Sequence, residues 1–145
     1  MMNATDILRD TRVSVSPETF AIVSLTPDVW AALLSDASLS PRMTAPFMIF
    51  KDRFEVTLVL DDVDLRNMRP GLAAARIENG YRMLTFETVL DMSVVGFMAE
   101  VSRILADAGV PILPISAFSR DHLLIRQTDL AATLKALGPH VSELC

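Results

Sequence analysis

The chain has few residues of the kinds that build reactive centres. Among its 145 residues are one cysteine, two histidines, one tryptophan and one tyrosine. The cysteine, Cys145, has no partner within the chain, so no intrachain disulfide forms, which fits a reducing cytoplasm. His122 and His140 lie far apart in the sequence, and no spacing typical of a zinc site is present. We therefore expect no metal ion and no cofactor.

Charged residues and long apolar runs are also scarce. Charged side chains make up 21% of the chain, and the formal net charge is -5. An acidic chain lacks the basic face that phosphate needs, so we expect no nucleic-acid partner. No apolar stretch reaches the ~18 residues of a membrane helix, and residues 1–10 lack the apolar core of a signal peptide. These features predict a cytoplasmic protein with no membrane partner.

Sequence motifs of common enzymes are missing as well. The sequence has no Gly-x-Ser-x-Gly nucleophile turn, no phosphate-binding loop and no dinucleotide fingerprint. Cys145 stands at the chain end, where fraying makes it a poor nucleophile. The aspartates at 61, 62 and 64 cluster, but the solvated start of a helix explains them. We therefore expect no enzymatic activity.

Apolar residues, in contrast, reach 51% of the chain, and their spacing in the first half predicts both strands and helices. Thr26-Pro27-Asp28 opens a helix, because threonine caps and proline suits the first helical position. Asn79-Gly80 predicts a hairpin, since a type I′ turn needs positive φ at both central residues. The expected strands are 12–16, 19–25, 46–50, 54–60, 74–78 and 81–89, and a further short helix is expected over 61–68.

The second half has a clearer pattern. Apolar residues at helical spacing predict a helix over 93–108, with Asp91 or Ser93 as its cap. Pro111 and Pro114 cannot donate to a strand ladder, so the strand over 110–118 should lie at a sheet edge. The remaining elements are a strand over 122–127 and a final helix, capped by Thr128-Asp129 and closed by Gly138-Pro139.

The order of elements repeats along the chain. The order β-α-β-β-α runs from Thr19 to Met68 and again from Tyr81 to Gly138, at an offset of about 64 residues. A β-α-β-β-α-β unit is the ferredoxin-like motif. We therefore predict an α+β fold of two ferredoxin-like units in tandem. The expected boundaries are 1–78, with the leading strand 12–16, and 79–145.

The second unit is one strand short. After its last helix only residues 141–145 remain, too few for a secure fourth strand. Residues 12–16 alternate like a strand with one buried face and have no assigned partner. Our hypothesis is that this N-terminal strand is exchanged into the second unit.

Two segments of the second half resemble a known family. Residues 90–97, Leu-Asp-Met-Ser-Val-Val-Gly-Phe, contain a small-residue Ser-x-Val-Gly loop before a helix. Residues 115–121, Ile-Ser-Ala-Phe-Ser-Arg-Asp, form an Ile-Ser-x-aromatic-x-x-Asp run into the next strand. In this order the two segments resemble ACT domains, above all small tandem ACT proteins related to aspartokinase regulatory domains and to a eukaryotic arginine sensor. The resemblance covers about residues 19–138.

The resemblance implies allosteric regulation by a small molecule, a free amino acid, bound at an interface between two ACT units. It also implies an oligomer, for which we expect a homodimer with a regulated protein partner. The residue chemistry agrees, because a helix start offers N–H groups to a carboxylate and an aspartate accepts an ammonium group. The expected ligand-binding residues are Asp91, Ser93, Val94, Val95, Gly96, Ile115, Ser116 and Asp121.

Several of these residues also have a structural explanation. Gly96 allows close packing of helix on sheet, Asp91 caps a helix, Ser116 faces solvent on an edge strand, and Asp121 suits a turn. Two other functions therefore stay open: a ligand-free interaction or dimerisation module, and a small ferredoxin-like enzyme. The methionines expected to fill the core are Met48, Met83, Met92 and Met98.

Overall fold

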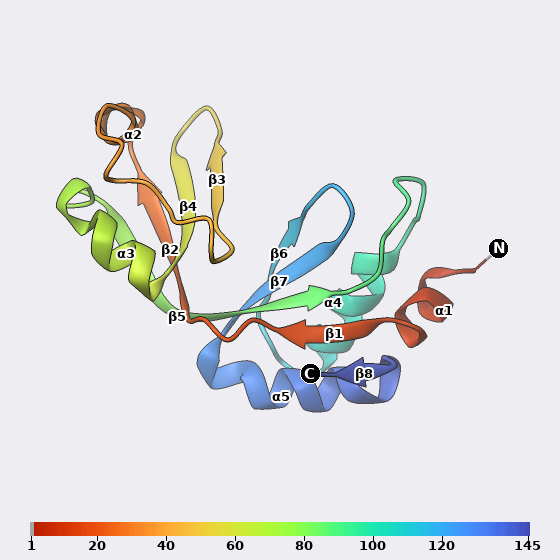
Figure 1. Cartoon of the computed structure of the whole chain (residues 1–145). Helices are drawn as coiled ribbons and strands as arrows, with labels where there is room; N and C mark the ends of the chain where they lie inside the picture. The colour runs from red at the N-terminus through yellow and green to blue at the C-terminus, as the bar shows by residue number, and fades with distance from the viewer. Residues whose placement is uncertain (1) are drawn as a thin grey trace. The chain divides into compact units, whose positions relative to one another are not determined.

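The computed structural model describes residues 2–145 and groups them into two compact units (Figure 1). The central unit is Glu18–Tyr81, and the terminal unit combines the chain up to Pro17 with Arg82–Cys145. Strand β5 (Arg76–Phe86) belongs to both, because the boundary falls between Tyr81 and Arg82. This grouping differs from the expected boundaries 1–78 and 79–145, since the leading strand joins the C-terminal half.

The central unit has the ferredoxin-like order and a sheet of order β3-β4-β2-β5. Each neighbouring pair of its strands is antiparallel. Side chains of both helices, among them Leu33 and Leu65, join the inner faces of the strands in one core. As expected, Thr26 caps α2, where its Oγ1 accepts from the Val29 N–H at 3.4 Å. The elements are β2 (Phe20–Leu25), α2 (Pro27–Leu34), β3 (Met48–Lys51), β4 (Val56–Asp61), α3 (Asp62–Met68), a 3-10 turn (Arg69–Gly71) and the first part of β5.

The terminal unit repeats this plan with additions at both ends. Its sheet has the order β6-β7-β5-β1-β8, with β6 at an edge, as the prolines predict. Its helices share one core with the sheet, through residues such as Leu8, Val101 and Leu137. The elements are α1 (Ala4–Arg9), β1 (Arg12–Val15), the second part of β5, α4 (Phe97–Asp107), β6 (Leu113–Ser116), β7 (Asp121–Arg126), α5 (Leu130–Leu137) and β8 (Glu143–Leu144), with 3-10 turns at Gln127–Asp129 and Gly138–His140.

Strand β1 supplies the strand that the second unit lacks. It pairs antiparallel with β5, so that Val13 faces Phe86 and Val15 faces Leu84. On its other side β8 runs parallel, and the Cys145 N–H donates to the Val13 carbonyl at 2.9 Å. Val13 is fully buried, at 0% exposure. The hypothesis of an exchanged N-terminal strand is confirmed.

The hairpin expected at Asn79-Gly80 is wrong, because β5 runs straight through both residues. Its register against β2 moves from Phe20–Tyr81 to Ile22–Glu78, which leaves two residues of β5 opposite the single Ala21. Such an extra residue is a β-bulge. Gly80 has φ +83°, so the positive φ that signalled a turn serves the bulge instead.

Several element starts also differ from expectation. Helix α4 begins at Phe97, and α1 had no sequence prediction at all. The Asp129 carboxylate accepts from Arg126 Nε at 3.0 Å and leaves α5 without a side-chain cap. Asp61 and Asp64 are 3% and 0% exposed, so the solvated helix start expected there is wrong.

Membrane-spanning helices are absent from residues 2–145, since none there is long and apolar enough. The cytoplasmic location stays a prediction.

One polar contact crosses the sheet face that lies away from the helices of the terminal unit. His122 Nδ1 lies 2.9 Å from Thr85 Oγ1. His122 is half-buried, and this burial lowers its pKa below the ordinary value. The neighbouring Asp121 raises the pKa and Arg120 lowers it, both to a smaller extent. The neutral imidazole is therefore the form that the fold favours.

The exchanged strand yields a first prediction. Deleting Met1–Ser16 exposes the edge of β5, so the amides of Thr85 and Glu87, which face β1, should lose protection from hydrogen exchange, whereas β2 and β4 should keep theirs. Truncating the buried contact alone, Val13→Ala, should lower the free energy of unfolding by roughly 2 kcal/mol. Ser14→Ala, on the opposite face of β1, is the matched control. Full protection of Thr85 and Glu87 in the deletion variant would contradict this role of β1.

The buried histidine yields a second prediction. The pKa of His122 is lower in the folded chain than in the unfolded chain. As the pH falls through about 6.5, the unfolded chain therefore binds more protons than the folded one. The stabilisation from the neutral imidazole is complete above that pH and is lost below it. Urea unfolding between pH 7.5 and pH 5 should therefore show a larger loss of stability in the wild type than in His122→Gln. Parallel pH profiles of the two chains would rule out this effect.

Candidate functional site

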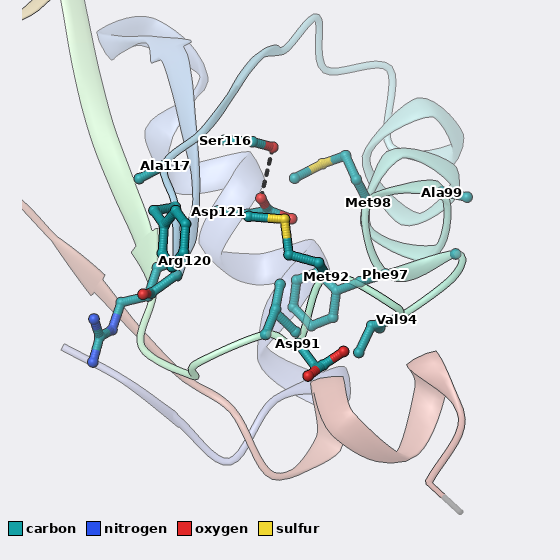
Figure 2. Close-up of a pocket in the computed structure, with 14 residues that line it drawn as sticks. Asp91, Met92, Val94, Phe97, Met98, Ala99, Ser116, Ala117, Arg120 and Asp121 are labelled. Carbon is teal, nitrogen blue, oxygen red and sulfur yellow. Dashed lines mark hydrogen bonds between the residues drawn. The ribbon is translucent and has the colours of Figure 1, made fainter.

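A cavity of about 730 Å³ opens in the terminal unit (Figure 2). It lies between the loop before α4, the first turn of that helix and the β6–β7 hairpin. The Leu90 N–H donates to the Ser119 carbonyl at 2.8 Å and so ties the loop to the hairpin. The lining residues are Leu90, Asp91, Met92, Val94, Gly96, Phe97, Met98, Ala99, Ser116, Ala117, Phe118, Ser119, Arg120 and Asp121.

The first turn of α4 presents backbone N–H groups to this cavity. The first intrahelical contact runs from the Glu100 N–H to the Gly96 carbonyl at 3.0 Å. The N–H groups of Phe97, Met98 and Ala99 precede it and have no carbonyl one turn back. Gly96 is the cap residue and has no side chain to satisfy them. These donors, at the positive end of the helix dipole, suit an anionic group.

The start of α4 is anchored to the core by Phe97. Its side chain is 3% exposed, and its ring meets the Phe86 ring of β5 edge-on at 5.6 Å. An edge-to-face pair of this kind has a preferred geometry and adds to the burial energy. The position of the helix start is therefore fixed from the inside of the unit, and its donors need not move to meet a ligand.

Gly96 is required by its backbone conformation. Its φ is +86°, a region that residues with a Cβ rarely adopt. Close packing is not the reason, since a Cβ placed there would meet only the Ala4 Cβ, at 4.0 Å. A side chain at Gly96 would therefore meet the strain of this φ but no steric clash.

Asp91 shapes the loop and does not cap α4. Its Oδ1 accepts from the Ser93 N–H at 2.8 Å and from the Ser93 hydroxyl at 2.5 Å. These two bonds, the hydroxyl first, lower the pKa of the Asp91 carboxyl group. The expectation of an Asp91 or Ser93 cap is wrong, because the helix begins later and the two residues pair with each other. Asp91 is thus an ionised, exposed carboxylate on the cavity wall.

A second carboxylate comes from the hairpin. Ser116 and Asp121 are cross-strand partners, and the Ser116 hydroxyl donates to Asp121 Oδ1 at 2.7 Å, as Figure 2 shows. Ile115 belongs to the opposite face of the sheet, since successive strand residues alternate, and its cross-strand partner is His122.

Five of the eight expected site residues line the cavity: Asp91, Val94, Gly96, Ser116 and Asp121. The other three, Ser93, Val95 and Ile115, are outside the lining. Ser93 instead holds Asp91, and Val95 is 87% exposed on the loop.

Apart from Val94, the apolar residues of the lining were not predicted from the sequence. Met92 is 75% exposed, so its expected place in the core is wrong, and Figure 2 shows it beside the cavity with Met98. Arg120 also contributes to the lining, but Figure 2 shows its guanidinium directed away from the cavity. Within residues 2–145 no cluster of three His, Cys, Asp or Glu side chains could hold a metal ion.

Comparisons with known proteins identify the family of the second half. Residues 76–138 match the family model described as ACT domain. No curated protein sequence matches the chain. A solved structure from Agrobacterium tumefaciens is similar, with 20% identity and a TM-score of 0.72, covering 94% of this chain and 92% of that one.

The regulatory subunits of aspartate kinase from two Thermus species are also similar. The ligand-free Thermus thermophilus subunit has 15% identity and a TM-score of 0.65, covering 92% of this chain and 98% of that one. The Thermus flavus subunit has 15% identity and a TM-score of 0.66, covering 88% of this chain and 95% of that one. Residues 76–138 thus match an ACT domain, and the chain as a whole shares the tandem ferredoxin-like fold of the regulatory subunits of aspartate kinase.

Proposed function

We propose that this chain is a regulatory protein that binds a free amino acid in the cavity at the start of α4. One observation carries the proposal: the cavity joins an uncapped helix start to two carboxylates, those of Asp91 and Asp121. An amino acid carries the complementary pair of charges. The similar structures that are regulatory subunits of aspartate kinase support a regulatory role.

The α-carboxylate of the ligand binds to the first turn of α4. The N–H groups of Phe97, Met98 and Ala99 have no acceptor within the helix, and the helix dipole favours negative charge there. Gly96, which lines the cavity just before these donors, has no side chain that could cover them.

The α-ammonium group binds to a carboxylate oxygen on the wall. Asp91 and Asp121 each use Oδ1 for a serine, which leaves Oδ2 free for a charge-assisted hydrogen bond. Since the lowered pKa keeps Asp91 ionised at neutral pH, the charge is present when the ligand arrives. Arg120 does not compete, because its guanidinium is directed away.

A second copy of the chain covers the open side of the cavity. Three apolar side chains at or beside the rim are largely exposed: Met92 at 75%, Val95 at 87% and Phe118 at 84%. Exposed apolar groups gathered at one place are typical of interaction sites. Ligand and partner copy would then stabilise each other, which is the coupling that regulation needs.

The same rim supports a competing function, a dimerisation module without a ligand. Met92, Val95 and Phe118 would then bury each other across two copies, and the cavity would fill with side chains. The two functions differ in one property: only the sensor gains stability from a small molecule at constant protein concentration.

The proposal predicts stabilisation by a free amino acid. Thermal unfolding should be recorded with each of the twenty amino acids at 10 mM and at fixed protein concentration. One or a few should raise the Tm, because a ligand at 100 times its Kd adds about 2.7 kcal/mol to the folded state. A flat response to all twenty, together with dimerisation, would favour the module instead.

A charge placed at Gly96 tests where the carboxylate binds. Gly96→Asp and Gly96→Asn have side chains of equal size and the same strained φ, so they differ only in charge. The aspartate should weaken binding of the amino acid about tenfold or more relative to the asparagine, since it repels the ligand carboxylate. The Kd values should be measured by calorimetry. Equal Kd values in the two variants would show that the ligand carboxylate does not bind at the start of α4.

A further inference from the structure

The link between α2 and β3 is an addition to the central unit. It spans residues 35–47, more than twice the length of its counterpart in the terminal unit, residues 108–112. Long links without secondary structure in compact domains are usually functional or disordered. This one is ordered by a specific set of contacts around Arg42.

Arg42 fixes the link to the central unit. Its Nε donates to Asp64 Oδ1 at 2.8 Å and its Nη2 to Asp61 Oδ2 at 2.5 Å. The backbone N–H of Arg42 also donates to Asp64 Oδ1, at 3.0 Å. The two carboxylates are buried, whereas the Arg42 side chain is 38% exposed. The charge that compensates two buried aspartates thus arrives from a surface link.

This ion pair has the features of a latch. Removing Arg42 from its place would leave two buried carboxylates without their cation, which is costly. Asp64 Oδ2 is buried without any partner among residues 2–145, so Arg42 is the main compensation of that group. The link is thereby held in one position while the rest of it stays exposed.

A second cavity, of about 220 Å³, lies directly behind the latched link. The link forms one wall from Asp36 to Pro41, and α2 and β3 form the others with Trp30, Leu33, Leu34 and Ile49. A dry apolar cavity of roughly 150 Å³ is large enough for benzene. This cavity therefore has room for a ring or a branched aliphatic group.

The lining of this cavity rejects charged ligands. It contains no lysine, arginine or histidine, so an anionic group has no partner there. Its one carboxylate, Asp36, already accepts from the Ser38 N–H at 3.0 Å and from the Ser38 hydroxyl at 2.6 Å. A free amino acid, with two charges, does not fit this chemistry.

We propose that residues 36–42 form a strap, latched by Arg42 onto Asp61 and Asp64, that walls a second small-molecule site in the central unit. The ligand is an uncharged molecule with an apolar ring or a branched aliphatic group. The site is distinct from the amino-acid site, since the two cavities share no lining residue.

Gly71 provides a way to close this site without touching the latch. A Cβ at Gly71 would lie 2.3 Å from Leu33 Cδ2 and 3.0 Å from Leu39 Cδ1, and both leucines line the cavity. Gly71→Ala therefore pushes flexible side-chain ends into the empty space. At Gly138 a Cβ would meet Leu144 Cδ1 at an ordinary 3.5 Å, so Gly138→Ala is a matched control.

The test uses toluene as the probe and Trp30 as the reporter, because Trp30 is the only tryptophan of the chain and lines the cavity. Emission excited at 295 nm should change saturably with toluene in the full chain. Gly71→Ala should abolish the change and Gly138→Ala should keep it. Arg42→Met should weaken toluene binding at least tenfold, whereas Arg126→Met, which removes an exposed ion pair, should not.

Three outcomes overturn the proposal. The absence of a saturable change in the wild type, up to the solubility limit of toluene, removes the site. An unchanged emission response in Gly71→Ala would show that toluene binds elsewhere in the chain. Wild-type affinity for toluene in a folded Arg42→Met variant would show that the strap does not wall the site. If that variant does not fold, the comparison of Gly71→Ala with Gly138→Ala decides whether the site exists.

Discussion

The pairing of β1 with β5 is the contact on which the terminal unit and its cavity depend. The chain after Tyr81 contains three strands of a ferredoxin-like unit in order, and β1, from before the central unit, supplies the fourth. It also gives β8 its partner, so both chain ends are held by the same strand. Since the central unit lies between β1 and the rest of the terminal unit in sequence, neither half of the chain contains a complete terminal unit by itself.

Contacts with the sheet of the terminal unit set the geometry of the candidate site. Phe86, the last residue of β5, faces Val13 and holds Phe97 at the start of α4. The loop between them is fixed to the β6–β7 hairpin by the bond from Leu90 to Ser119. The donors of α4, the Asp91 carboxylate of the loop and the Asp121 carboxylate of the hairpin are thus brought to one cavity by backbone contacts.

Much of the fold follows from local sequence patterns. The order of elements, the cap at Thr26 and the edge position of β6 are set by periodicity, threonine chemistry and proline, all of which act within a few residues. The Asn79-Gly80 hairpin failed because the pattern reports only a positive φ, which a turn and a bulge share. At Gly80 the chain continues as β5, and the register shift against β2 between Phe20 and Ile22 accommodates the positive φ in a bulge.

The site could be predicted only in part from the sequence, because local patterns do not report tertiary contacts. The pattern located both segments, but Asp91 and Ser93 form the same local bonds in a loop turn as at a helix cap, so the true start of α4 was missed. Met92 is as apolar as a core residue, and its exposure depends on tertiary placement. Arg42 is separated from Asp61 and Asp64 by about twenty residues, and no local pattern predicts their contact.

The central claim is that the first turn of α4 binds the carboxylate of an amino acid. The most direct measurement is a titration followed by nitrogen-15 NMR with an amino acid that raises the Tm. The amide resonances of Phe97, Met98 and Ala99 should shift saturably, with the Kd found by calorimetry. Saturable binding that leaves these three resonances in place and shifts others would contradict it.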